Sequence, residues 1–208
     1  DPRAEPGMVV IDVKAAGVSF TDVLIVLGKF QFQPPFPFSP GGEIAGIISE
    51  VGEGVADWKE GDRVIAMVGN GGIAEKTSAY AATLMPLPES MDFKDGAAFP
   101  LNYGTTYYAL KQRGELKKGE TLLVTGAGGG VGTTAIEIGK AMGARVIAAA
   151  SNQEKLDIAQ RLGADEIVNY GDGELKEKVK ELTDGLGADV IYDAVGGDIF
   201  LQCMRCIN

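Results

Sequence analysis

A glycine-rich turn carries the clearest chemical signal in this sequence. The apolar run Thr121–Thr125 leads into Gly126, Gly129 and Gly132. The residues that follow recur at helical spacing: Val131, Ala135, Ile138 and Met142. Such a turn is too tight for a Cβ, and it lets a pyrophosphate approach the backbone at a helix N-terminus, where free N–H groups favour negative charge. The pattern predicts a dinucleotide site, although no window reads strictly G-x-G-x-x-G; a tight strand–helix connection without a ligand is the alternative.

The residues after the next predicted strand, Arg145–Ala150, indicate which dinucleotide fits. An NAD site places an acid about 20 residues past the glycines. Here Ser151 and Asn152 occupy that place, and Lys155 follows one helical step later. A hydroxyl, an amide and a cation suit a 2′-phosphate, which a carboxylate would repel. The pattern favours NADPH over NADH; the alternatives are a helix N-cap at Ser151 and a solvated surface lysine at Lys155.

Composition excludes several classes of function. The chain has 208 residues, 45% hydrophobic content and a net charge of −10, which argues against a nucleic-acid or anionic-membrane partner. No apolar run is long enough to span a membrane, and no signal peptide is visible. We therefore expect a cytoplasmic protein of one or two domains.

The types of residue that could bind metal or exchange protons are few. The sequence contains no histidine, which removes histidine triads, histidine acid–base catalysis and histidine-ligated zinc within these residues. Cys203 and Cys206 form a lone C-x-x-C without a second pair. We interpret both as reduced cysteines and expect no metal site.

The first half of the chain is predicted to be rich in β-structure. A capping box, Ser19-x-x-Asp22, precedes a short helix over Val23–Leu27. We expect a helix over Asp92–Arg113 that breaks at Pro100. The predicted strands are Met8–Val13, Gly42–Val51, Arg63–Val68 and Lys76–Leu87.

From Thr121 onward, strands alternate with helices, which predicts a parallel sheet with helices on both faces. The later strands are expected at Arg145–Ala150, Glu166–Tyr170 and Ala188–Val195. This makes four strands, whereas a complete doubly wound dinucleotide sheet has about six. We therefore expect the chain to be a fragment that lacks its C-terminal part.

Several segments together resemble the medium-chain dehydrogenase/reductase superfamily and, within it, the zinc-free NADPH:quinone oxidoreductase branch that includes zeta-crystallin-like proteins. The similar segments are Gly17–Asp22, Pro40–Gly46, Gly61–Val64, Asn102–Tyr107, Gly126–Gly132 and Asp193–Gly197. The resemblance implies an α/β fold in which a β-rich GroES-like substrate domain, residues 1–99, precedes an incomplete Rossmann-type doubly wound domain, residues 100–208.

The chain departs from the zinc-dependent members of that superfamily at two positions. Ser19 stands where they have a ligand cysteine, and Gly42 where they have a ligand histidine. The resemblance therefore implies no catalytic zinc. An alcohol is hard to activate without a Lewis acid, whereas quinones and enones are already electrophilic. The implied reaction is hydride transfer from NADPH to a quinone or another α,β-unsaturated carbonyl.

The resemblance also assigns site residues. Ser19, Phe20, Phe30 and Tyr103 would line the substrate pocket. Tyr103 is the one candidate acid, and its alternative role is that of a packed aromatic side chain. Solvent is then the other source of the proton. The cofactor residues would be Gly126, Gly129, Gly130 and Val131 at the pyrophosphate; Ser151, Asn152, Lys155 and Tyr170 at the 2′-phosphate; Thr105 at the carboxamide; and Val195 and Gly196 at the nicotinamide ribose.

Two alternatives stay open. A reductase of enoyl thioesters shares this fold, and a non-catalytic, crystallin-like NADPH-binding protein is of a different class. The resemblance further implies a homodimer when the protein is full length.

Overall fold

The computed structural model describes residues 1–171 and 173–208, which divide into two compact units, Asp1–Leu101 and Asn102–Asn208. Each unit has its own hydrophobic core, so each is described by itself. None of the helices in the described ranges is long and apolar enough to cross a membrane.

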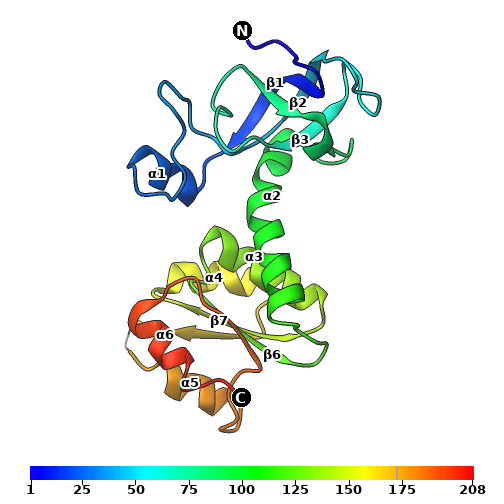
Figure 1. Ribbon diagram of the computed structural model, residues 1–208. Helices are drawn as coiled ribbons and strands as arrows, with labels where there is room; N and C mark the ends of the chain where they lie inside the picture. The colour runs from blue at the N-terminus through cyan, green and yellow to red at the C-terminus, as the bar shows by residue number, and fades with distance from the viewer. Residues whose placement is uncertain (172) are drawn as a thin grey trace. The chain divides into compact units, whose positions relative to one another are not determined.

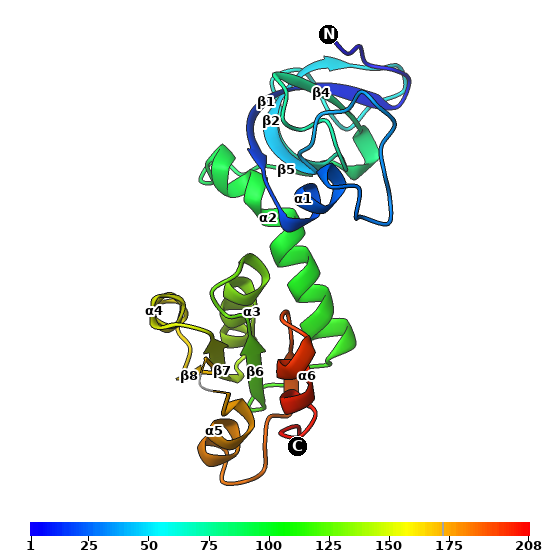
Figure 2. The same ribbon diagram turned by 90° about the vertical axis from the view of Figure 1, so that its left-hand side faces the viewer.

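The first unit is built on a five-stranded antiparallel sheet of order β4-β1-β2-β3-β5, and Figure 2 labels β1, β2, β4 and β5 of this sheet. The strands are β1 (Met8–Gly17), β2 (Glu43–Val51), β3 (Arg63–Met67), β4 (Lys76–Tyr80) and β5 (Met85–Pro86). Alternate residues of β1, β2 and β3 face one core, which includes Val9, Ile11, Ile44, Ile48 and Val64.

The prediction of one continuous strand over Lys76–Leu87 is wrong. Met8, the first residue of β1, pairs with Tyr80, so the partner strand ends there. A 3-10 turn, Ala81–Thr83, then redirects the chain, and Trp58 donates its indole N–H to the Ala81 carbonyl at 3.0 Å. The chain continues as β5 on the other edge of the sheet, beside β3.

Helix α1 (Phe20–Val26) begins with the predicted capping box, which is confirmed. The Ser19 hydroxyl oxygen accepts the Asp22 N–H at 3.4 Å, and an Asp22 oxygen accepts the Ser19 N–H at 2.8 Å. The second Asp22 oxygen accepts the Gly41 N–H at 2.9 Å. Asp22 therefore ties the start of α1 to the loop before β2.

Helix α2 (Phe93–Tyr107) runs through Pro100 without the predicted break, so that prediction is wrong. A proline inside a helix removes one backbone donor and crowds the preceding turn. The next N–H, that of Leu101, donates to Glu43 Oε2 at 2.9 Å. A carboxylate far away in the sequence thus satisfies the backbone where the proline disturbs it. A π-helical turn over Tyr108–Arg113 follows.

The second unit is a doubly wound α/β fold. Its parallel sheet has the order β8-β7-β6-β9 and comprises β6 (Thr121–Thr125), β7 (Arg145–Ala150), β8 (Glu166–Asn169) and β9 (Val190–Tyr192). Its helices are α3 (Gly130–Ala141), α4 (Gln153–Arg161), α5 (Leu175–Leu182) and α6 (Gly197–Cys203). Figure 1 shows α3 and α4 on one face of the sheet and α5 and α6 on the other.

Both faces of this sheet are buried, as its nearly continuous apolar strands predict. Leu122 and Val124 pack toward α3, while Leu123 faces α5 and α6. Cys203 and Cys206 lie in the second of these cores as free, buried thiols, and burial raises the pKa of Cys203 to about 12. They therefore behave as small apolar core residues.

Strand β9 is shorter than the predicted Ala188–Val195. The chain leaves the sheet at Asp193, whose carboxylate accepts the N–H groups of Val195 (3.0 Å) and Gly196 (3.2 Å). A side chain that bonds its own backbone two and three residues ahead closes a turn instead of extending a strand.

Candidate functional site

The glycine turn lies between β6 and the N-terminus of α3. Gly126 has φ +63°, a conformation that side chains rarely adopt. A Cβ at Gly132 would overlap the Gly126 carbonyl oxygen, so the turn packs against the first turn of the helix with no room to spare. Gly126 and Gly132 therefore have strict steric reasons to be glycine, whereas a Cβ on Gly129 would lie 3.4 Å from the Gly126 carbonyl oxygen, an ordinary contact.

The first turn of α3 presents free backbone donors. Its N-cap is Gly129, which has no side chain to accept a hydrogen bond. The first bond of the helix runs from the Thr133 N–H to the Gly129 carbonyl at 2.8 Å, so the N–H groups of Gly130, Val131 and Gly132 precede the helical ladder. Together with the helix dipole, these groups can hold an anion such as a pyrophosphate.

Lys155 lies beside this turn. A Cβ built on Gly128 would come within 2.6 Å of both Cβ and Cγ of Lys155, so the lysine stem covers the glycine backbone. Lys155 is exposed, and none of the ion pairs in the described residues involves it. The α4 terminus thus brings to the glycine turn a lysine that has no ion pair within the part of the chain that the structure describes.

The alternative that Ser151 caps α4 is wrong. The N-cap is Asn152, whose Oδ1 accepts the Lys155 N–H at 3.0 Å. Both residue types cap helices well, and the sequence does not fix which one starts the first turn. Ser151 is exposed, with its side chain free of that role.

Two further predicted cofactor residues meet at Gly126. A Cβ on Gly126 would lie 3.2 Å from Cγ2 of Val195, which the turn at Asp193 holds in place. Tyr170 lies close enough to the Gly126 N–H for that group to lower its pKa, but burial and the charge of nearby Asp193 raise the pKa overall. The carboxyl ends of β6, β8 and β9 therefore converge on the glycine turn.

The part of α2 that belongs to the second unit faces α3. The Tyr103 hydroxyl donates to Glu137 Oε2 at 2.6 Å, so the group that the sequence offers as an acid is a donor to a carboxylate. Asn102 Oδ1 would lie 2.9 Å from a Cβ on Gly130, which places its amide over the first turn of α3. Thr105 is exposed.

The first unit contains a separate, mostly apolar cavity of about 160 Å³. Two of the predicted substrate residues, Ser19 and Phe30, lie in its wall. Phe20 is not part of this wall and is 76% exposed on α1. The remaining wall residues are Thr21, Asp22, Ile25, Phe32, Gly42, Glu43, Met67, Gly69 and Leu101.

Both ionisable groups in the wall are carboxyl groups, those of Asp22 and Glu43. Burial raises the pKa of Asp22, but hydrogen bonds from Ser19, Gly41 and Gly42 outweigh it and hold this pKa below its ordinary range. Burial likewise raises the pKa of Glu43, and here it prevails over the bond from Leu101, with the charge of Asp22 adding to the rise. The cavity therefore suits a neutral molecule better than an anion.

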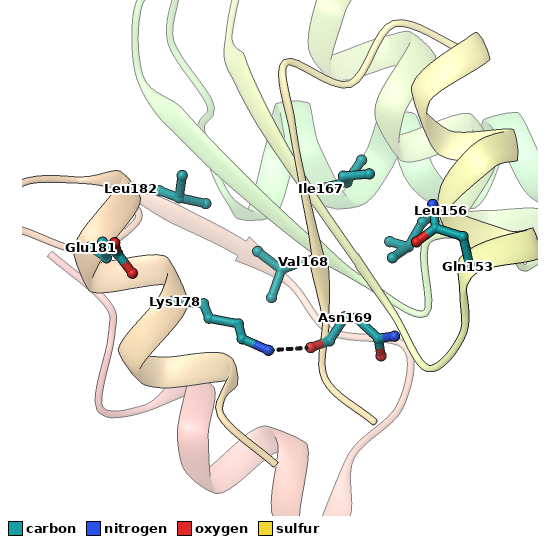
Figure 3. A pocket seen from close by; sticks show the side chains of 8 residues that line it. All are labelled: Gln153, Leu156, Ile167, Val168, Asn169, Lys178, Glu181 and Leu182. Atoms are coloured by element: carbon teal, nitrogen blue, oxygen red, sulfur yellow. Dashed lines mark hydrogen bonds between the residues drawn. The ribbon is translucent and has the colours of Figure 1, made fainter. Parts of the chain in front are cut away.

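A larger hollow of about 410 Å³ lies elsewhere in the second unit, between α4, α5 and the edge strand β8. None of the predicted site residues lines it. Figure 3 shows the Lys178 amine directed at the Asn169 carbonyl, and the hydrogen bond between them measures 3.1 Å. Lysine at a sheet edge covers unpaired backbone groups, so the hollow is best explained as a protected edge.

Sequence reasoning missed Glu43, Asn102 and Asp193 as site residues. Glu43 offers a signal in retrospect, since it is a carboxylate directly before the apolar run of β2. Asn102 and Asp193 offer none, because their placement depends on packing between elements. Within the described ranges, no three carboxylate or thiol groups come close enough to hold a metal ion.

Two family models match the chain. Residues 5–89 match the alcohol dehydrogenase GroES-like domain, and residues 130–208 match the zinc-binding dehydrogenase domain. The quinone oxidoreductase-like protein 2 homolog of Nematostella vectensis is 44% identical over 199 residues, which are 95% of this chain and 54% of that protein. The chain thus spans little more than half the length of this curated relative.

Solved structures give the same result. The Escherichia coli quinone oxidoreductase complexed with NADPH is 33% identical, with a TM-score of 0.94 over 100% of this chain and 64% of that one. The CurK enoyl reductase is 30% identical, with a TM-score of 0.92 over 100% of this chain and 65% of that one. With matching models for both halves and a shared fold throughout, the chain belongs to the medium-chain dehydrogenase/reductase superfamily, among relatives named as quinone oxidoreductases.

Proposed function

We propose that the chain is part of an NADPH-dependent oxidoreductase that reduces a quinone or another α,β-unsaturated carbonyl without zinc. The observation that carries this proposal is the glycine turn at the α3 N-terminus with Lys155 against it. The relative from Escherichia coli, a quinone oxidoreductase complexed with NADPH, supports the same cofactor.

The residues of the turn fit a dinucleotide. The N–H groups of Gly130 and Val131, together with the space left by Gly126 and Gly129, would hold the pyrophosphate. Ser151, Asn152, Lys155 and Tyr170 would surround the 2′-phosphate, where Lys155 supplies a free cation. Thr105 would hold the carboxamide, and Val195 and Gly196 the nicotinamide ribose. Bound NADPH supplies a hydride, and the protein supplies binding and orientation.

The cavity of the first unit supports a neutral, apolar carbonyl substrate. Its wall is largely aromatic and aliphatic, and its ionisable groups are two carboxyl groups, of which Asp22 favours the negative form. Zinc independence rests on the sequence, which has Ser19 and Gly42 at the ligand positions of zinc-dependent relatives and contains no histidine. An electrophilic quinone or enone requires orientation and exclusion of water more than a Lewis acid.

An enoyl-thioester reductase is the second candidate, because the CurK enoyl reductase shares the fold along the whole chain. A non-catalytic, crystallin-like NADPH-binding protein is the third. We place the protein in the cytoplasm on its composition and its reduced cysteines, and we expect a homodimer at full length on the resemblance.

The test is NADPH oxidation by the protein at the full length that its gene encodes, with a quinone, an enone and an enoyl thioester as acceptors. Oxidation with the quinone or enone is the expected result. Oxidation with the thioester alone would favour the enoyl reductase. NADPH binding without oxidation by any of these acceptors would favour the crystallin-like protein.

A further inference from the structure

Glu43 is a buried carboxyl group in the wall of an apolar cavity. Glu43 is the first residue of β2 and is 3% exposed. The same cavity wall includes Phe30, Met67 and Leu101. Oε2 accepts the Leu101 N–H at 2.9 Å. Oε1 lies beside Gly17, because a Cβ built on Gly17 would come within 2.6 Å of it. None of the hydrogen bonds given for the described residues reaches Oε1, and this oxygen is not among their fully buried polar atoms without a partner, so it is accessible.

The other polar groups of the wall are committed elsewhere. Asp22 accepts from Gly41 and twice from Ser19, so both of its oxygens are used. The Ser19 hydroxyl donates its proton to Asp22 at 2.8 Å. The Thr21 hydroxyl is a far weaker acid than any carboxyl group. Glu43 is thus the wall residue best able to give up a proton.

We propose that protonated Glu43 donates the proton that completes reduction of a carbonyl substrate held in this cavity. The role rests on the proposed function. When a hydride supplied by NADPH, which is thereby oxidised to NADP⁺, adds to the substrate carbon, an electron pair moves onto the carbonyl oxygen. That oxygen takes the proton of Glu43, the carboxyl O–H bond breaks, and its electrons remain on Glu43 as a carboxylate. A proton from solvent water restores the acid.

The surroundings of Glu43 favour its neutral form. Burial raises the pKa of this carboxyl, the Leu101 N–H lowers it, and the negative charge of Asp22 on α1 raises it again. The neighbours from β1, β3 and α2 are Gly17, Met67 and Leu101, none of which titrates. Burial among apolar neighbours is a recognised way to keep a carboxylic acid protonated for donation.

Glu43→Gln tests the role, because the glutamine carbonyl still accepts from Leu101 while the acidic proton is gone. Glu53→Gln, an exposed change of the same charge near the end of β2, is the matched control. In the full-length protein, we expect Glu43→Gln to lower kcat for quinone reduction by about 10²–10⁴-fold, the usual contribution of a general acid. Glu53→Gln should leave this kcat unchanged, and neither substitution should change the Kd for NADPH. The wild-type rate should fall as pH rises through the Glu43 pKa, and the variant should lack this limb.

A second measurement does not depend on turnover. With ¹³C-labelled glutamate, the carboxyl resonance lost in Glu43→Gln identifies Glu43, and we expect it to ionise above pH 4.5, the ordinary value for a glutamate. Ionisation of Glu43 at or below pH 4.5 would overturn the proposal. An active wild type with an equally active Glu43→Gln variant would overturn this role alone. A wild type that reduces neither quinone nor enone would overturn the proposed function as well.

Discussion

The Leu101 N–H donates to the Glu43 carboxylate at 2.9 Å, directly after Pro100 in the middle of α2. This one bond joins the start of β2 to the helix at the point where proline removes a backbone donor. It explains how α2 continues through Pro100, and it fixes one oxygen of a carboxyl group that lines the cavity.

We expect Glu43→Ala and Glu43→Gln to differ in stability. Alanine leaves the Leu101 N–H without its acceptor, which costs about 1–3 kcal/mol when the group is buried. Glutamine retains an acceptor and should unfold at nearly the wild-type denaturant concentration. Urea unfolding of the three proteins measures the difference. Equal destabilisation by both variants would show that the acceptor for the Leu101 N–H does not support α2.

Gly132→Ala should destabilise the second unit. The added Cβ would overlap the Gly126 carbonyl oxygen, which is backbone and cannot rotate away. Overpacking of this kind typically costs about 1–3 kcal/mol. Gly104→Ala is the control, because a Cβ there meets nothing within 4 Å and should stabilise α2 by about 0.5–1 kcal/mol. If chemical denaturation showed that both variants change the free energy of unfolding in the same direction, the packing described for the turn would be contradicted.

Tyr103→Phe should reveal a structural role for this hydroxyl. It removes the 2.6 Å bond to Glu137, and a hydrogen bond to a charged group contributes about 1.5–3 kcal/mol. Tyr107→Phe on the same helix, at a side chain 52% exposed, should leave stability unchanged. We expect both variants to keep the wild-type kcat for quinone reduction. A Tyr103→Phe variant of normal stability that loses turnover would restore tyrosine as the acid.

Asp193 should make stability depend on pH in the acid range. Burial raises its pKa, but the bonds from Thr125, Val195 and Gly196 outweigh burial and hold the folded-state pKa below the ordinary 3.8. Its contribution is therefore complete above pH 3.8 and is lost as pH falls through the folded-state pKa. Asp193→Asn should flatten this loss, whereas Asp198→Asn, an exposed change on α6, should not. Parallel acid-unfolding curves for wild type and Asp193→Asn would contradict the assignment.

The order of elements in the second unit could be predicted because each rests on local periodicity. Strand β6, the glycine turn and α3 all lie where the apolar spacing indicates. The capping box of α1 is equally local, and the structure confirms it.

The errors arise where a distant residue decides the local structure. Helix α2 survives Pro100 because Glu43, 58 residues away from Leu101, supplies an acceptor. The strand predicted over Lys76–Leu87 stops at Tyr80 because its partner β1 begins at Met8. The burial of Glu43 follows from the same tertiary contacts, so the sequence around it indicates a carboxyl group beside an apolar strand but not the cavity that it lines.

The choice of Asn152 over Ser151 as the cap of α4 illustrates a third limit. Both residues can accept the N–H of the third helical residue, and the difference between them is smaller than the energy of packing α4 against β7 and β8. Lys155 falls near the start of α4 whichever residue caps the helix. Only the structure shows that the stem of its side chain lies against Gly128.

The most direct test of the account is a fluorescence titration with NADPH and NADH of wild type, Lys155→Ala and Lys111→Ala, the last an exposed lysine of the same unit. We predict NADPH binding at least about tenfold tighter than NADH, or about 1.4 kcal/mol, in wild type and Lys111→Ala, and loss of this preference in Lys155→Ala. Equal binding of the two cofactors by wild type, or a preference for NADH, would contradict the assignment of the glycine turn and Lys155 to NADPH.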